Sequence, residues 1–254
     1  MIVQARLFFC ALQFMTRLPT PRLTGFRPEW IARSAPYFPM VGWVVGAISA
    51  AAFLAASQLW PGLPASVIAV IAGLLVTGGF HEDGLADTAD GLGGGQTPAR
   101  RLEIMKDSRI GSYGALALWS VLTLKVVLLA VLPPWQGALA LLLIHGAGRA
   151  AAAVVMASLS YVREPDEAKL GPSPMAVRPH EAAITLVLGV APMILWPSPV
   201  QAVVGLILAA IGAAGLALLS RRLIGGFTGD VLGGVEQLAE LGLLLGFTAK
   251  VLGG

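Results

Sequence analysis

Three aspartates that could share a metal ion, Asp83, Asp87 and Asp90, lie in the segment 80–91. Their spacing of i, i+4 and i+7 places the three carboxylates on one face of a helix. Like charges on one stripe repel each other unless a cation neutralises them, and dense hard oxygen ligands suit Mg²⁺ or Mn²⁺ rather than zinc. The pattern therefore predicts a magnesium site, with a solvated helix end as the alternative.

Charges of both signs follow in the segment Lys106-Asp107-Ser108-Arg109. In phosphoryl-transfer sites carboxylates hold the metal ion while Lys and Arg hold phosphate oxygens. A basic anchor at a membrane surface would explain Lys106 and Arg109, but it requires neither Asp107 nor Ser108. We therefore predict that this segment contacts a phosphorylated substrate, with Ser108 as a binding residue.

Two further features could contact a substrate. Residues 91–95 read Gly-Leu-Gly-Gly-Gly, and as a turn they could offer the N–H groups of Gly93 and Gly94 to phosphate oxygens or form a hinge. Asp230 precedes the last apolar segment, where it could cap a helix or supply another carboxylate to the metal ion.

Two carboxylates, Glu236 and Glu240, lie within the last apolar segment and require partners there. His145 and Arg149, spaced i, i+4 in another apolar segment, are the candidate partners. Arg149 is also a candidate substrate-binding residue, and its long side chain could instead extend to the membrane surface.

Membrane-spanning helices must position these residues. Of 254 residues, 56% are hydrophobic and 12% are charged, whereas about 25% are charged in soluble domains. Residues 34–80 contain no Asp, Glu, Lys or Arg, enough for two helices of about 20 residues each. Because barrel strands would alternate in polarity, we expect one all-α domain over residues 1–254, a polytopic helical bundle. The predicted spans are residues 36–59, 64–81, 112–132, 136–158, 181–197, 199–220 and 231–252, the last of which could instead lie against the bundle or in the membrane interface.

The N-terminal residues predict a helix lying in the membrane interface. Gln13 interrupts their apolar patch and no small-residue cleavage site follows, so a signal peptide is disfavoured. The single cysteine, Cys10, excludes an intramolecular disulfide. The net charge of +3 comes without a dense basic stripe, so we expect membrane lipid, not nucleic acid, as a partner. A homo-oligomer is compatible with the sequence.

Basic residues indicate which side of the membrane the polar segments face. Of the 17 Lys and Arg residues, 14 lie in the segments 1–35, 82–111, 159–180 and 221–230. The turns near Pro61, Pro133 and Pro197 contain none. The positive-inside rule therefore places the N-terminus and the polar segments in the cytoplasm.

The chain resembles the cobalamin synthase (adenosylcobinamide-GDP ribazoletransferase) family over its whole length. The motifs that carry the resemblance are FMTRLP (14–19), YFPMVG (37–42), HEDGLADTADGL (81–92), EIMKDSRIGSYG (103–114) and GGFTGDVLGG (225–234). The resemblance implies an enzyme of the bacterial cytoplasmic (inner) membrane that requires Mg²⁺. It would join adenosylcobinamide-GDP to α-ribazole, or to its 5′-phosphate, and release GMP.

The resemblance also implies roles for residues already singled out. A ribose hydroxyl would attack the phosphorus attached to the cobinamide. The three aspartates would hold Mg²⁺ against the pyrophosphate, and Lys106 and Arg109 would stabilise the departing phosphate. The hydroxyl proton would pass to one of three candidate bases, which are Glu82, Asp107 and His81.

Two other functions are considered, that of a different membrane enzyme and that of a transporter. A CDP-alcohol phosphotransferase would carry an Ala-Arg pair shortly after Asp90-Gly91, and no arginine follows there before Arg100. An ion-coupled transporter would have repeated halves and its acidic residues near the middle of the bilayer. The main acidic cluster instead lies at the end of a predicted span, and no repeat is found.

Overall fold

The computed structural model describes residues 2–162 and 175–250 of the chain. Every regular element in these ranges is a helix, and the one β-type contact is a bridge between Tyr161 and Phe227. The elements are α1 (Ile2–Met15), α2 (Glu29–Arg33), η1 (Ala35–Tyr37), α3 (Phe38–Ser57), α4 (Leu63–Thr77), α5 (Phe80–Gly94), α6 (Pro98–Met105), α7 (Ser112–Ala130), α8 (Pro134–Ser158), α10 (Pro179–Val190), η2 (Ala191–Leu195), α11 (Pro199–Ile224) and α12 (Gly229–Phe247). Arg163 and Lys169, which the topology argument used, lie outside the described residues.

The all-helical membrane architecture is confirmed. Within the described residues, four segments are long and apolar enough to cross a membrane, namely α7, α8, α11 and α3 with the preceding η1. On α7 and α11 large apolar side chains point outward, among them Trp119 at 69% exposure and Ile211 at 62%. Such surfaces suit contact with lipid.

The predicted number of seven crossings stays a prediction. Each predicted span contains a helix, but α4 reaches spanning length only together with α5, and the two are bent by 90°. α10 with η2 is shorter than a full span. α12 carries Asp230, Glu236 and Glu240, and its predicted continuation to residue 252 ends outside the described residues.

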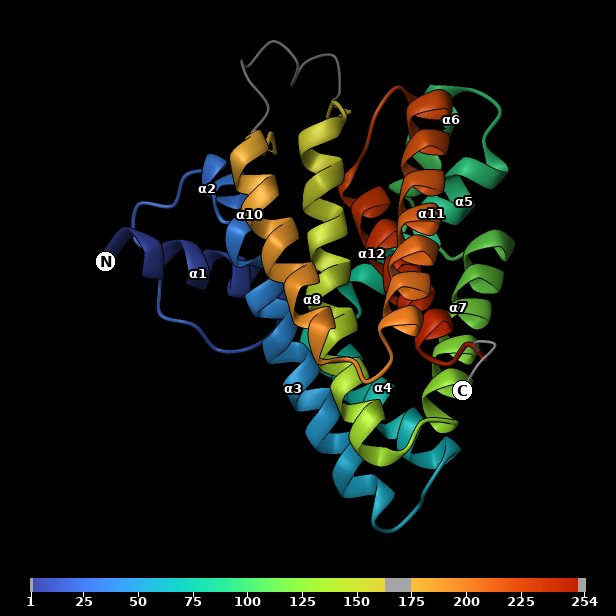
Figure 1. Ribbon diagram of the computed structural model, residues 1–254. Helices are drawn as coiled ribbons and strands as arrows, with labels where there is room; N and C mark the ends of the chain where they lie inside the picture. Colours follow the sequence, from blue (N-terminus) through green and yellow to red (C-terminus); the bar gives the residue numbers. More distant parts are fainter. Residues whose placement is uncertain (1, 163–174, 251–254) are drawn as a thin grey trace.

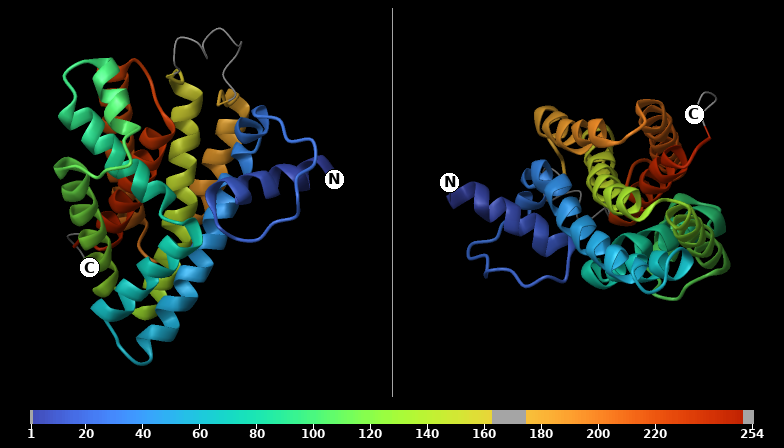
Figure 2. Two further views of the ribbon diagram at one scale, coloured as in Figure 1. Left: turned by 180° about the vertical axis from the view of Figure 1, so that it is seen from behind. Right: turned by 60° about the horizontal axis from the view of Figure 1, so that its bottom comes forward.

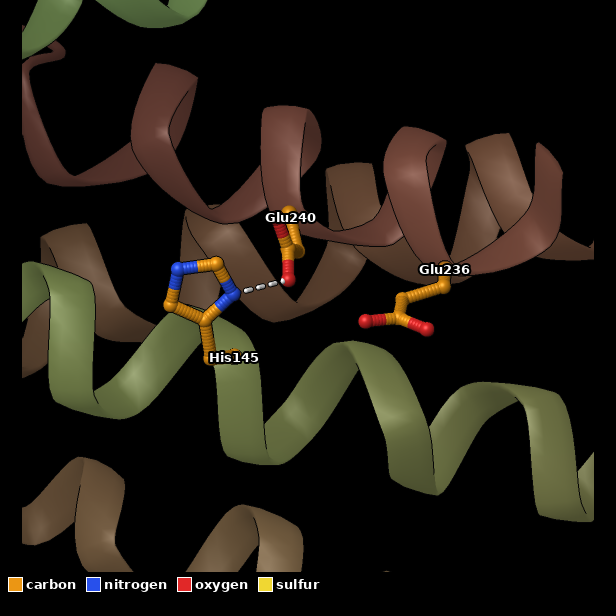
Figure 3. A group of neighbouring side chains, drawn as sticks. All are labelled: His145, Glu236 and Glu240. Carbon is orange, nitrogen blue, oxygen red and sulfur yellow. Dashed lines mark hydrogen bonds and ion pairs between the residues drawn. The ribbon is translucent and has the colours of Figure 1, made fainter. Parts of the chain in front are cut away.

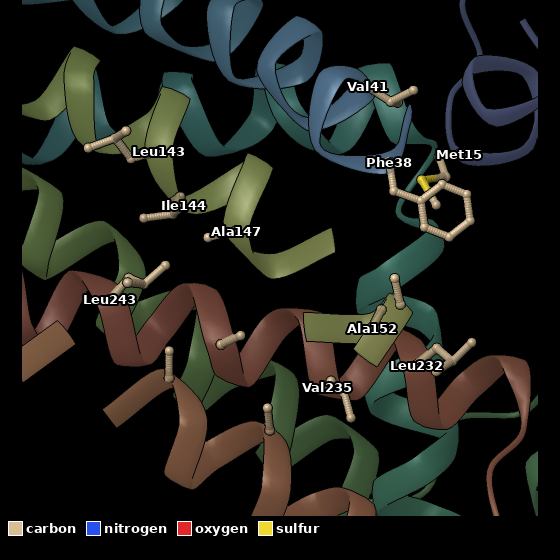
Figure 4. Close-up of a cluster of buried hydrophobic side chains, with 14 of the residues drawn as sticks. Met15, Phe38, Val41, Leu143, Ile144, Ala147, Ala152, Leu232, Val235 and Leu243 are labelled. Carbon is tan, nitrogen blue, oxygen red and sulfur yellow. The ribbon is translucent and has the colours of Figure 1, made fainter. Parts of the chain in front are cut away.

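α12 lies in the middle of the bundle. It packs against α11, α5, α8 and α7, and nearly all of its side chains are buried. Figure 1 shows it enclosed by these helices, while α3 and α8 run side by side along the molecule. Burial inside the bundle is compatible with a membrane span, so whether this segment crosses the membrane stays a prediction. Val235 and Leu243 of α12 belong to the same buried cluster as Leu143 and Ile144 of α8 (Figure 4).

Proline and glycine set the ends of the helices. Proline occupies the first turn of α6, α8, α10 and α11, where its missing N–H costs nothing. Gly78 and Gly79 have φ of 70°, a left-handed conformation that side chains disfavour, and their N–H groups close the end of α4 at the Leu74 carbonyl. The predicted span 64–81 is therefore wrong at its end, because the glycine pair stops the helix at Thr77 and turns the chain into α5.

The predicted polar loop over residues 82–111 is largely helical. α5 continues through Gly94, so the expected glycine-rich turn is wrong for Gly93 and Gly94. Within a helix the backbone N–H groups donate to carbonyls four residues earlier, as Gly95 does to Gly91 at the helix end. These glycines therefore have no spare N–H groups for a phosphate.

The N-terminal helix is confirmed as a helix, and its place in the membrane interface stays a prediction. α1 projects sideways from the bundle in Figures 1 and 2. The Tyr37 hydroxyl bonds to Gln4 at 2.6 Å, and Met15 is buried against the bundle. The Arg17 backbone N–H donates to the Val76 carbonyl at 2.7 Å, which ties the end of α1 to α4.

We predict that Gly246→Ala destabilises the protein, because a Cβ there would overlap the backbone of Gly205, where α12 touches α11. Overpacking of this kind costs about 1–3 kcal/mol. Gly215→Ala on α11 is the control, since a Cβ there has no atom within 4 Å. Thermal unfolding in detergent, followed by tryptophan fluorescence, measures both. Equal melting temperatures for the two variants would contradict the close packing.

Candidate active site

The described residues bring three carboxylates together from two helices, Asp83 and Asp87 of α5 and Asp230 of α12. We call these residues the acidic site. The charges of Asp83, Asp230 and Asp90 all act on the Asp87 carboxylate, and that of Asp83 acts on Asp230. No ion pair between described residues includes a member of the acidic site. Within the described part of the chain this negative charge has no ion-pair partner, which favours binding of a cation.

A close crossing of α5 and α12 creates the acidic site. A Cβ on Gly84 would lie 2.8 Å from the Asp230 carbonyl oxygen, and a Cβ on Gly233 would lie 2.9 Å from the His81 carbonyl oxygen. Only glycine allows the backbones to approach this far. The crossing therefore sets Asp230 beside the aspartates of α5.

The acidic site fits Mg²⁺ by its ligand type. All three residues offer hard oxygen atoms, and they range from half-buried to exposed, so a substrate can share the ion. Their oxygens are spread too widely to form a compact cage, because the one group within 4.8 Å among the described residues lies elsewhere. Mg²⁺ commonly keeps several waters and binds one or two carboxylates plus substrate phosphates, which suits a wide arrangement.

Asp90, the third predicted metal ligand, points toward the start of α7. Its two carboxylate oxygens accept the N–H groups of Gly111 at 2.7 Å and Gly114 at 2.9 Å. A carboxylate at a helix N-terminus satisfies otherwise unbonded N–H groups and interacts favourably with the helix dipole. Asp90 thus joins α5 to α7, and its part in metal binding stays a prediction.

The compact group of potential metal ligands is formed by His145, Glu236 and Glu240 inside the bundle (Figure 3). Glu240 contacts His145 at 2.7 Å and Lys125 at 2.6 Å, while Glu236 contacts Arg149 at 2.8 Å. The cations Lys125 and Arg149 balance the two carboxylates, so an added ion is not needed for neutrality.

The predicted pairing of His145 and Arg149 with Glu236 and Glu240 is confirmed by these contacts. The alternative that Arg149 reaches the membrane surface is wrong, because its side chain is 1% exposed. A charge buried this deeply needs an opposite charge beside it, and Glu236 supplies that charge. A substrate-binding role for Arg149 stays a prediction.

Lys125 and Gln237 take part in the same network and were missed as functional candidates. Lys125 Nζ donates to Gln237 Oε1 at 2.6 Å, and both side chains are buried. The available signal was a lone lysine in an otherwise apolar segment, since such a charge marks a polar partner inside the membrane domain.

His81 and Glu82 direct their polar atoms into the bundle. His81 Nε2 lies 2.5 Å from Glu236, and Glu82 Oε1 accepts Gln237 Nε2 at 2.9 Å. The second Glu82 oxygen is also buried. Both residues therefore face away from the solvent in this structure.

The segment 106–109 connects α6 to α7 and is mostly exposed. Arg109 donates to Asp107 at 2.6 Å, and this bond is the main reason that the pKa of Asp107 falls to about 2. Met105, the last residue of α6, lies against Thr228, whose hydroxyl donates to Asp230 at 3.3 Å. The segment therefore begins next to the acidic site, at the end of α6, and its Ser108 is exposed.

Comparisons with known proteins identify the family. The model of the family described as cobalamin-5-phosphate synthase matches residues 7–248. The chain belongs to this family. No solved structure matches the chain significantly.

Several curated relatives of this cobalamin-5-phosphate synthase family member are named adenosylcobinamide-GDP ribazoletransferase. The relative from Leptothrix cholodnii is 43% identical over 99% of this chain and 98% of its own length. The relative from Shewanella woodyi is 44% identical over 96% of this chain and 97% of its own length. The relative from Ralstonia pickettii is 44% identical over 94% of this chain and 93% of its own length. The similarity thus extends through both helices of the acidic site.

We predict that Asp90→Asn destabilises the protein by about 1–3 kcal/mol, because a buried N–H at the start of α7 loses its acceptor. Asp107→Asn is the control, since that carboxylate bonds to Arg109 within its own exposed loop. Chemical or thermal unfolding in detergent measures the difference. A stable Asp90→Asn variant with weakened Mn²⁺ binding would instead make Asp90 a direct ligand.

Proposed function

We propose that the chain is an adenosylcobinamide-GDP ribazoletransferase, which joins adenosylcobinamide-GDP to α-ribazole or its 5′-phosphate and releases GMP. The observation that carries the proposal is the convergence of Asp83, Asp87 and Asp230 in a chain of the cobalamin-5-phosphate synthase family. Full-length similarity to relatives of that name supports it over the phosphotransferase and transporter alternatives.

Asp83, Asp87 and Asp230 would hold the Mg²⁺ ion. When bound, the ion neutralises charge on the diphosphate and on the phosphate that leaves. Asp83 is exposed, so phosphate oxygens could reach an ion bound there. Asp90 supports this arrangement by tying α5 to α7.

Lys106 and Arg109 would contact the phosphate of the departing GMP. Arg109 is bound to Asp107 in this structure, and its five N–H donors allow it to keep that bond while it binds a phosphate. The Asp107 carboxylate thereby orients the guanidinium.

The reaction forms a bond from the ribose hydroxyl oxygen to the phosphorus on the cobinamide side. The bond from that phosphorus to the oxygen of GMP breaks, and the hydroxyl gives up its proton. Of the three candidate bases, His81 and Glu82 face the interior. Asp107 is accessible, but a pKa of about 2 makes it a weak base near neutral pH.

The distribution of basic residues supports a cytoplasmic site in the bacterial inner membrane. In Figure 1 the ends of α8 and α11, the start of α10 and all of α6 lie at one end of the bundle. The proline-containing turns between α3 and α4, α7 and α8, and η2 and α11 lie away from that end. The end formed by α6, the start of α10 and the end of α11 carries five arginines, Arg100, Arg101, Arg178, Arg221 and Arg222. The positive-inside rule expects such a concentration of basic residues on the cytoplasmic face.

We predict that the purified protein releases GMP from adenosylcobinamide-GDP only when α-ribazole or its phosphate and Mg²⁺ are both present. Chromatographic detection of GMP, with and without EDTA, measures this. Release that persists without the ribazole would indicate a hydrolase, and release in EDTA would contradict the metal site.

Asp83→Ala, Asp87→Ala and Asp230→Ala are each expected to lower kcat by at least roughly 100-fold, because each removes a carboxylate placed to hold the ion. Glu103→Ala is the matched control, since Glu103 is an exposed acid on α6 that pairs with Arg100. Wild-type activity in the Asp87 variant would refute the assignment.

Arg109→Ala is expected mainly to raise KM for adenosylcobinamide-GDP, because it removes a phosphate contact that exists before and during the reaction. Initial rates at varied substrate concentration separate KM from kcat. An unchanged KM would leave Arg109 as a membrane anchor.

A further inference from the structure

Two contacts behind the acidic site join the first turn of α5 to α12. His81 Nε2 lies 2.5 Å from Glu236, and Gln237 Nε2 donates to Glu82 Oε1 at 2.9 Å. We call these two contacts the α5–α12 clamp. Consecutive residues of one helix thus bind consecutive residues of the other, and the proposed reaction uses neither contact.

Lys125 determines which way the Gln237 amide points. A lysine ammonium group carries donors and no acceptor, so the Gln237 oxygen must face it, as their 2.6 Å contact shows. The amide nitrogen is then directed at Glu82, which accepts the hydrogen bond. Lys125 is itself held by Glu240, which also binds His145 of α8. The clamp is therefore anchored to α7 and α8.

The clamp and the acidic site occupy one stripe of α12. Asp230, Gly233, Gln237 and Glu240 are spaced so that they follow one face of a helix. The rise of 1.5 Å per residue puts Gln237 about 10 Å behind Asp230. On α5, Glu82 directly precedes Asp83. A shift between the two helices would therefore break the clamp and separate Asp83 and Asp87 from Asp230.

The directed contacts of the clamp add to the close approach at Gly84 and Gly233. A shift in register would bring a Cβ against the facing backbone at that approach. It would also leave buried polar groups of the clamp without partners, at a cost of about 1–3 kcal/mol each. His81, Glu236 and Gln237 are all at most 4% exposed, so their polar groups are shielded from bulk solvent.

We propose that Glu236 and Gln237 are positioning residues that, through His81 and Glu82, hold α5 in register with α12 and so set the affinity of the acidic site for its divalent ion. The proposal rests on the proposed function only in that the acidic site binds the ion.

The test is direct Mn²⁺ binding to the full chain in detergent, measured by the electron paramagnetic resonance signal of free Mn²⁺. Gln237→Glu sets a second carboxylate against Glu82 and is expected to weaken binding roughly 10- to 100-fold, the range seen when partners of metal ligands are lost. Gln201→Glu is the matched control, because the Gln201 amide is also hydrogen-bonded, to Trp196 and to the Ala249 carbonyl, away from α5.

A paired exchange distinguishes positioning from general damage. In the double variant Gln237→Glu/Glu82→Gln, the amide introduced at position 82 donates to the carboxylate introduced at position 237. That carboxylate still accepts from Lys125, so the clamp is rebuilt with its groups exchanged. We expect Mn²⁺ affinity to return to within about 3-fold of the Glu82→Gln single variant, because coupled neighbours are not additive. Failure of the exchange to restore binding would overturn the proposal. If Gln237→Glu does not fold, Gln237→Met removes the same contact.

The outcomes separate this inference from the proposed function. Loss of Mn²⁺ binding in Asp87→Ala identifies the acidic site as the one measured. If the wild type binds Mn²⁺ and the Gln237→Glu variant binds it with the same affinity, only the inference about the clamp is overturned. Absence of wild-type binding overturns the metal site and with it the clamp's role. Wild-type binding without GMP release overturns the proposed function and leaves the clamp to be judged by Mn²⁺ affinity.

Discussion

The contact between α5 and α12 is the constraint on which the rest of the structure depends. It places Asp230 beside Asp83 and Asp87, although their charges repel each other. The repulsion is tolerable because the helices are held by other means, the close approach at Gly84 and Gly233 and the polar contacts behind it. Negative charge kept in place by the fold is the condition for capturing a cation.

A polar interior lies behind that contact and joins α12 to α7 and α8. Glu236 and Glu240 are almost fully buried on a central helix, an arrangement that costs several kcal/mol per ion without compensation. Lys125, Arg149 and His145 supply the compensation from α7 and α8. Charges that face inward from three helices can neutralise each other, and they also make the position of each helix depend on the others.

The apolar helices give this machinery its place in a membrane. α7 and α11 expose large aliphatic and aromatic side chains outward, while α5 and α6 gather the charged residues at one end. The turn at Gly78 and Gly79 separates the two environments, because it redirects the chain by 90° from apolar α4 into acidic α5.

The helical class, the apolar segments and the residue types proposed for the site could all be predicted from the amino-acid sequence alone. Long uncharged runs in lipid satisfy their backbone only as helices, and three aspartates at helical spacing must share a face whatever surrounds them. The sequence also indicated Glu236 and Glu240 as buried charges with His145 and Arg149 as partners. The tertiary structure decided which carboxylates meet. It turned Asp90 to the start of α7 and brought in Asp230, and it drew His81 and Glu82 inward through Glu236 and Gln237. These outcomes depend on where α5 crosses α12, and helix crossings are fixed by contacts between distant segments, which local spacing does not encode.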